Sequence, residues 1–189
     1  MNSMLALAHR LILRWRAADI GPVTLRPVRP DDADALQDFV RARSPASRRL
    51  RFHVALHELS EAMIEAITCV DQRGHVAFVL TVAERGTERI VGEARHAVSG
   101  DLETAEFGIA VADAVQGQGL AERLMAALID AARARGLRWL IGEALAGNSR
   151  TLSFARRCGL AATTRGMEPG IVRVERSVDR SMRLAGAAG

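Results

Sequence analysis

The feature that most constrains this fold is a change of hydrophobic period in the middle of the chain. Within residues 103–111, large apolar side chains alternate with small or charged ones, as in a half-buried strand. Residues 119–135 instead carry leucines in one i, i+4 row, which is typical of an amphipathic helix. Two glycines, Gly117 and Gly119, lie between these segments. A strand that runs through a glycine loop into a long helix predicts an α/β fold.

Further strands and helices are predicted on both sides of this unit. The expected strands are 22–28, 75–83, 89–98, 137–145, 161–164 and 171–178, and the expected helices begin near Asp31, Ser60 and Ser149. We expect residues 44–52 to form a polar, arginine-rich loop. The order of the elements indicates one α/β (α+β) domain, with a mixed, mostly antiparallel central sheet and helices on both faces.

The length of 189 residues fits a single domain, which we place at residues 21–180. Residues 1–20 carry apolar side chains at helical spacing and predict an amphipathic N-terminal extension. We expect this helix to pack on the domain or on a second copy of the chain in a homodimer. A helix lying on a membrane surface is the alternative. Residues 181–189 are small and apolar and predict a flexible tail.

Composition excludes several classes of function. All 26 basic residues are arginine, which explains a pI near 10.6 at a net charge of only +4. Aromatic residues are not interleaved with the arginine clusters, so we expect no nucleic-acid partner. The two cysteines do not have the spacing of a disulfide framework, and no apolar run is long enough to span a membrane. We therefore expect a cytoplasmic protein. No residues show metal-ligand spacing, and no metal is expected.

The glycine loop predicts a binding site for a phosphate or pyrophosphate. Backbone N–H groups at a helix start are unpaired and carry the positive end of the helix dipole. A P-loop would need a lysine, and the chain has none. A dinucleotide site would need a third glycine, and Glu122 would meet a pyrophosphate with the wrong charge. A tight turn without a ligand is the remaining alternative.

The pattern Gln116-x-x-Gly119-x-Ala121 resembles the acyl-CoA signature, Q/R-x-x-G-x-G/A, of the GNAT superfamily of N-acetyltransferases. The resemblance extends over residues 22–178 and implies acetyl-CoA as co-substrate, with direct transfer of its acetyl group to an amine. It also implies that CoA is bound by the strand end, the loop and the head of the next helix, namely Ile109, Ala110, Val111, Gln116, Gly117, Gln118, Gly119, Leu120, Ala121 and Asn148.

Several segments are more specifically similar to the catalytic domain of bacterial Pat-type protein lysine acetyltransferases. These segments are 44–52, 59–60, 68–71, 105–107 and 148–160. The similarity implies a protein lysine as acceptor. A small-molecule amine acetyltransferase and a non-catalytic acyl-CoA-binding sensor are the alternatives.

Glu106 is the candidate general base, because it occupies the position that resembles the Pat-type catalytic glutamate. Glu103 and Glu93 are the alternatives. Many GNAT enzymes use a tyrosine as general acid, but the matching position is Ala155 and the chain has no tyrosine. A thiol with a pKa near 8.5 leaves as thiolate without much help. Cys158 could donate a proton, although we expect a packed thiol at the end of a helix.

Overall fold

One mixed sheet organises the residues that the computed structural model describes, which are 11–52, 57–84 and 86–179. Its eight strands follow the order β1-β2-β3-β4-β5-β6-β8-β7. The strands are β1 (Leu13–Ala17), β2 (Gly21–Pro27), β3 (His75–Glu84), β4 (Thr87–Val98), β5 (Thr104–Val111), β6 (Trp139–Leu145), β7 (Ala161–Thr163) and β8 (Ile171–Ser177). The helices are η1 (Pro30–Asp32), α2 (Ala33–Arg41), α3 (Pro45–Phe52), α4 (Glu61–Thr68), η2 (Asp113–Val115), α5 (Leu120–Arg135) and α6 (Ser149–Arg157).

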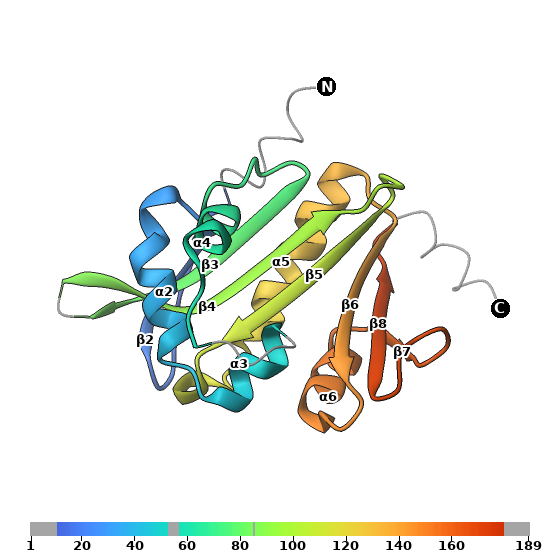
Figure 1. The fold of residues 1–189 in the computed structure, drawn as a ribbon. Coiled ribbons are helices and arrows are strands. Elements are labelled where there is room, and N and C mark those ends of the chain that lie inside the picture. Colours follow the sequence, from blue (N-terminus) through green and yellow to red (C-terminus); the bar gives the residue numbers. More distant parts are fainter. Residues whose placement is uncertain (1–10, 53–56, 85, 180–189) are drawn as a thin grey trace.

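The sheet is antiparallel except where β5 meets β6. These two strands run parallel and pair only over residues 104–106 and 139–141, although both continue beyond that point. Figure 1 shows β5 and β6 diverging, and we call the opening between them the fork. Along the fork, the edge of β5 that faces β6 has backbone N–H and C=O groups that pair with no other strand of the described residues. An extended ligand can pair with such an edge.

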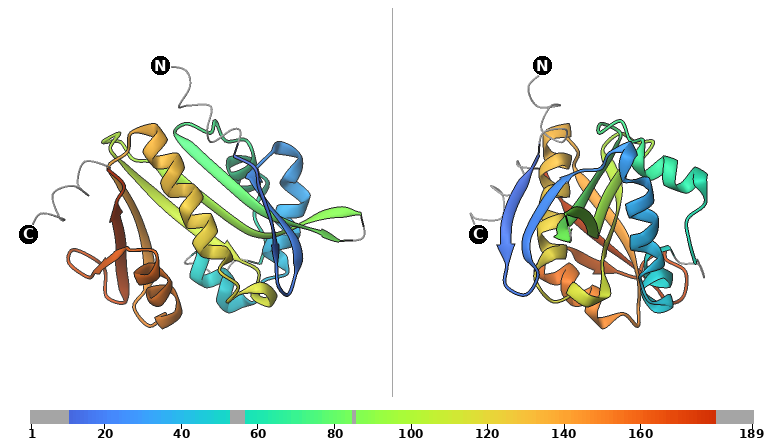
Figure 2. Two further views of the ribbon diagram at one scale, coloured as in Figure 1. Left: turned by 180° about the vertical axis from the view of Figure 1, so that it is seen from behind. Right: turned by 90° about the vertical axis from the view of Figure 1, so that its left-hand side faces the viewer.

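Helices cover both faces of the sheet, as the views in Figure 2 show. On one face α5 and α6 share a core with the sheet, built on side chains such as Leu124, Leu128 and Ala155. On the other face α2 and α4 pack through Leu36, Phe39 and other apolar residues. The predicted fold class, a mixed and mostly antiparallel sheet with helices on both faces, is confirmed.

The predicted N-terminal helix is wrong for residues 13–17, which form strand β1. This strand pairs antiparallel with β2, with Trp15 opposite Val23. Trp15 packs against the core, and the Arg123 guanidinium lies 4.4 Å from the centre of its ring. Residues 1–10 and the predicted tail, 181–189, lie outside the described residues. No helix within the described ranges has the length and apolar character needed to cross a membrane.

The expected loop at 44–52 is also wrong, because helix α3 begins at Pro45. Proline suits the first position of a helix, where its missing N–H would have no partner. The Ser44 hydroxyl accepts the N–H of Ser47 (3.1 Å) and so caps the helix. The dense arginines of the segment concealed this start.

Candidate active site

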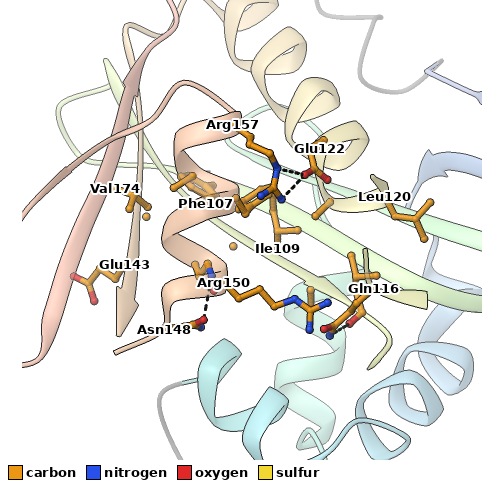
Figure 3. A pocket seen from close by; sticks show the side chains of 18 of the residues that line it. Phe107, Ile109, Gln116, Leu120, Glu122, Glu143, Asn148, Arg150, Arg157 and Val174 are labelled. Carbon is orange, nitrogen blue, oxygen red and sulfur yellow. Dashed lines mark hydrogen bonds and ion pairs between the residues drawn. The ribbon is translucent and has the colours of Figure 1, made fainter. Parts of the chain in front are cut away.

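A cavity of about 790 Å³ occupies the fork between β5 and β6. Its walls come from β5, the loop after it, the first turn of α5, β6 and α6, with Arg43 and Ser47 contributed from the region of α3. Figure 3 shows side chains from these elements converging on one space. Segments that are distant in sequence therefore meet at the place where the sheet opens.

The loop between β5 and α5 forms the anion end of this cavity. Gly117 and Gly119 have φ angles of +86° and +73°, in the left-handed region that other residues rarely adopt. Gly119 is the N-cap of α5, so the first N–H groups of that helix lie unpaired beside the cavity. The Gln116 side-chain amide donates to the Val111 carbonyl oxygen (3.1 Å) and to the Asp113 carboxylate (2.9 Å). These bonds tie the loop to the strand end.

Asp113 joins this loop to helix α3. Its carboxylate accepts the N–H of Ser44 at 2.8 Å and the hydroxyl of Ser47 at 2.5 Å. Partial burial raises the pKa of Asp113, but the hydrogen bonds from the two serines outweigh burial and hold the pKa below its usual value. The carboxylate is therefore ionised at neutral pH and fixes the position of α3 relative to the loop.

Helix α6 supplies the opposite wall of the cavity. Asn148 caps it, because its side-chain oxygen accepts the Thr151 N–H at 3.0 Å. Arg150, Phe154 and Arg157 line the cavity from one face of this helix. In Figure 3 the Arg150 side chain extends toward Gln116. Sequence reasoning missed these three residues, although their i, i+4, i+7 spacing was a usable signal.

Glu122, whose negative charge would repel a phosphate, is paired with Arg157 in the structure. Its carboxylate oxygen lies 3.0 Å from Nε and 2.7 Å from Nη2 of Arg157. The ion pair links the first turn of α5 to the last turn of α6, and both side chains line the cavity. A phosphate at the head of α5 would therefore meet a paired carboxylate.

Of the three candidate bases, Glu106 lines the cavity. It lies on the sheet face opposite α5 and directly pairs with Ile141 at the last rung before the fork. Glu103 is exposed and forms an ion pair with Arg138 (3.0 Å), and Glu93 is buried beside Ala110. Glu143 of β6 also lines the cavity, opposite Arg173 of β8, and was not considered as a base from the sequence.

Ala155 and Cys158 occupy the two positions that sequence reasoning considered for an acid that protonates the departing thiolate. Ala155 lines the cavity at the place where the resemblance would put a tyrosine. Cys158 is buried in the core, and burial, followed by the nearby Glu122 charge, raises its pKa to about 11. Its thiol is therefore protonated and packed at neutral pH.

The structure brings nearly all predicted site residues to this one cavity. The residues that line it are Glu106, Ile109, Ala110, Val111, Gln116, Gly117, Gly119, Leu120, Ala121 and Asn148. Gln118 lies in the same loop but is not part of the lining. In the described ranges, no group of three or more His, Cys, Asp or Glu residues is placed to hold a metal ion.

This arrangement has the parts required for acyl transfer from a phosphate-bearing thioester. The glycine loop and the head of α5 suit phosphates. The open edge of β5 suits an extended amide chain, and the carboxylate of Glu106 lies at the closed end of the fork on the other face of the sheet.

Comparison with known proteins gives a consistent result. The family model described as an acetyltransferase (GNAT) domain matches residues 23–161. The acetyltransferase PA5475 of Pseudomonas aeruginosa is 36% identical over 126 residues, which cover 67% of this chain and 68% of that protein.

Two solved structures are similar in fold. The GNAT domain of S. lividans PAT is 26% identical, with a TM-score of 0.79 over 88% of this chain and 96% of that domain. The yncA protein of Salmonella typhimurium, solved with its cofactor acetyl-CoA, is 19% identical, with a TM-score of 0.66 over 84% of this chain and 95% of that one. At that identity the second likeness concerns the fold alone.

Proposed function

Because the chain belongs to the GNAT acetyltransferase family, we propose that it transfers the acetyl group of acetyl-CoA directly to the side-chain amine of a protein lysine, with Glu106 as general base. The observation that carries the proposal is that Glu106 and the glycine loop share one cavity. The likeness to the GNAT domain of S. lividans PAT supports the choice of a Pat-type acceptor.

Acetyl-CoA would lie along the fork, with its phosphates at Gly117, Gly119 and the head of α5. The extended pantetheine arm would pair with the free edge of β5 at residues 109–111. Asn148 and Arg150 would face this arm from α6. The cavity suits such a ligand because the glycine loop, the free edge of β5 and α6 all contribute to its lining.

A base is needed because the acceptor amine is protonated in water. A lysine with a pKa near 10.4 is neutral in roughly 1 of 2,500 molecules at pH 7. Glu106 would take a proton from the ammonium, directly or through one water. A positioned base of this kind contributes about 10²–10⁴-fold to the rate.

The neutral amine would then attack the thioester carbonyl carbon. The new C–N bond forms, the nitrogen loses its second proton to solvent water, the C–S bond breaks, and the electron pair leaves with sulfur as the CoA thiolate. Backbone N–H groups near Ile109 would stabilise the oxyanion between these events. A thiolate leaving group has no need of the tyrosine acid, which agrees with alanine at position 155.

The test is CoA release from acetyl-CoA, measured with a pool of lysine peptides and with a set of small amines. Glu106→Gln is the test variant, and Glu103→Gln is its matched control, because it alters an exposed acid of the same region that points elsewhere and pairs with Arg138. We expect release with peptides, a loss of about 100-fold or more in Glu106→Gln, retained acetyl-CoA binding, and near-normal rates in the control.

Other outcomes assign the alternatives. Release with small amines only would make the protein a small-molecule acetyltransferase. Tight acetyl-CoA binding without release from any acceptor, in wild type and in Glu106→Gln alike, would favour the sensor. Loss of activity in Glu103→Gln, with none in Glu106→Gln, would move the base to the other glutamate.

A further inference from the structure

The closed end of the fork is formed by an aromatic ring that touches a glycine on the opposite strand. A Cβ placed on Gly142 of β6 would lie 2.8 Å from both Cε1 and Cζ of Phe107 and 3.2 Å from Cε2. Real Cβ atoms essentially never show contacts under 3.0 Å, so the ring reaches this place only because residue 142 has no side chain. Phe107 thus spans the gap between two diverging strands.

The position of this contact along the fork is informative. Glu106 and Ile141 form the last rung that joins β5 to β6, and Phe107 and Gly142 are the next residues on the two strands. The ring therefore lies at the first step where the strands separate. It faces α5 and α6, on the sheet face opposite Glu106, and both residues line the cavity.

The length of the pantetheine arm places the thioester near this ring. From phosphate to sulfur the arm has about a dozen chain atoms, as many as roughly four residues of strand, or about 13 Å at 3.3 Å per residue. With the arm entering the fork at Val111, the end of β5 nearest the glycine loop, four residues back along the strand lead to Phe107. An acyl chain longer than acetyl would have to continue toward the closed end of the fork.

The ring is bounded on two sides. On the strand behind it, His96 lies directly opposite Phe107 in the β4–β5 register and is only 1% exposed. Residues that face each other in an antiparallel pair have Cβ atoms about 5 Å apart on the same side of the sheet. Phe107 is therefore confined between a buried histidine and Gly142.

We propose that Phe107, seated on Gly142, sets the acyl-chain length of the transferred group and restricts it to acetyl and the shortest homologues. This inference rests on the proposed function, because it assumes that an acyl-CoA thioester lies in the fork. It assigns a specificity-determining role to a residue that neither holds a phosphate nor moves a proton.

The test compares acetyl-CoA with butyryl-CoA and hexanoyl-CoA in wild type and Phe107→Ala. Two readouts are needed: the Kd of each thioester by titration calorimetry without acceptor, and kcat/KM with the best acceptor. We expect wild type to favour acetyl-CoA over hexanoyl-CoA by on the order of 100-fold or more, and Phe107→Ala to reduce this preference to less than about tenfold. Trp139→Leu, which alters an aromatic residue of β6 that does not line the cavity, is the control and should keep the acetyl preference.

Gly142 provides an independent check. Gly142→Ala should displace the ring into the cavity and weaken acetyl-CoA binding by about tenfold or more. Adding Phe107→Ala to this variant should restore binding, because the new methyl group then has no ring to meet. If Phe107→Ala does not fold, Phe107→Leu serves in its place, with acceptance of butyryl-CoA as the expected gain.

The outcomes separate this inference from the proposed function. Turnover of acetyl-CoA by wild type, with unchanged chain-length preference in folded Phe107→Ala, would overturn the role of Phe107 and leave the proposed function standing. Suppose instead that wild type binds acetyl-CoA in preference to longer thioesters, that Phe107→Ala abolishes this preference, and that no acceptor is acetylated. This result would support the role of Phe107 and overturn the proposed function. Equal binding of acetyl-CoA and hexanoyl-CoA by wild type would refute the restriction itself.

Discussion

His96 is expected to make the stability of the protein depend on pH between about 6.5 and 4. The residue is 1% exposed on β4, and neither ring nitrogen has a hydrogen-bond partner in the described part of the chain. Burial, with a smaller contribution from the charge of His75, lowers the pKa of His96 from 6.5 to about 4. The folded protein thus holds this imidazole neutral where the unfolded chain binds a proton.

The sign and size of the effect follow from proton linkage. Because the unfolded chain binds more protons in this window, stability is complete above pH 6.5 and falls as the pH drops toward 4. The whole shift corresponds to about 3 kcal/mol at 1.36 kcal/mol per pKa unit. Between pH 7.5 and pH 5, protonation of His96 in the unfolded chain raises the unfolding equilibrium constant by a factor of about 30, which is about 2 kcal/mol.

The assay is urea unfolding at pH 7.5 and at pH 5 for wild type and His96→Leu. Leucine is apolar, does not titrate and is close to histidine in size, so the variant should lose about 2 kcal/mol less than wild type between the two pH values. His75→Gln is the control, because His75 is exposed and should change the difference little. Equal losses in wild type and His96→Leu, or an imidazole that titrates near pH 6.5 by NMR, would refute the reasoning.

Three further changes test other contacts. Asp32→Asn weakens the buried pair with Arg26, whose atoms lie 2.7 Å apart, and should lower the free energy of unfolding by about 3 kcal/mol in a denaturant titration. Glu122→Gln removes a negative charge beside the proposed phosphate site and frees Arg157, so acetyl-CoA should bind about threefold more tightly by calorimetry, with a steeper salt dependence. Asp113→Ala releases the hydrogen bonds to α3 and the loop, and should cost about 1–3 kcal/mol of stability and raise the KM for acetyl-CoA more than it lowers kcat. An unchanged value in any of these measurements would contradict the corresponding assignment.

Local sequence signals were sufficient for the segment from β5 to α5. The strand period, the helical leucine row and the glycines with positive φ angles all act within a few residues, so their effects can be read from the chain. The resemblance to a known family then placed Glu106 and Asn148, which the structure brings to the same cavity.

The features that sequence analysis missed depend on distant contacts. Trp15 fits a helical period and an alternating one equally well, and pairing with β2 decides for a strand. The start of α3 is fixed by Asp113, whose partner Ser44 lies 69 residues away. The contact between Phe107 and Gly142 likewise exists only once β5 and β6 are packed together.

In the proposed reaction Glu106 removes the proton from an amine while acetyl-CoA lies in the fork. The most direct measurement is the rate of CoA release with the lysine-peptide pool for wild type, Glu106→Gln and Glu103→Gln, alongside the Kd of acetyl-CoA for each. We expect Glu106→Gln to lose about 100-fold or more in rate while its Kd stays within about threefold of wild type. A Glu106→Gln variant that is as fast as wild type, or wild type that binds no acetyl-CoA, would contradict the proposal.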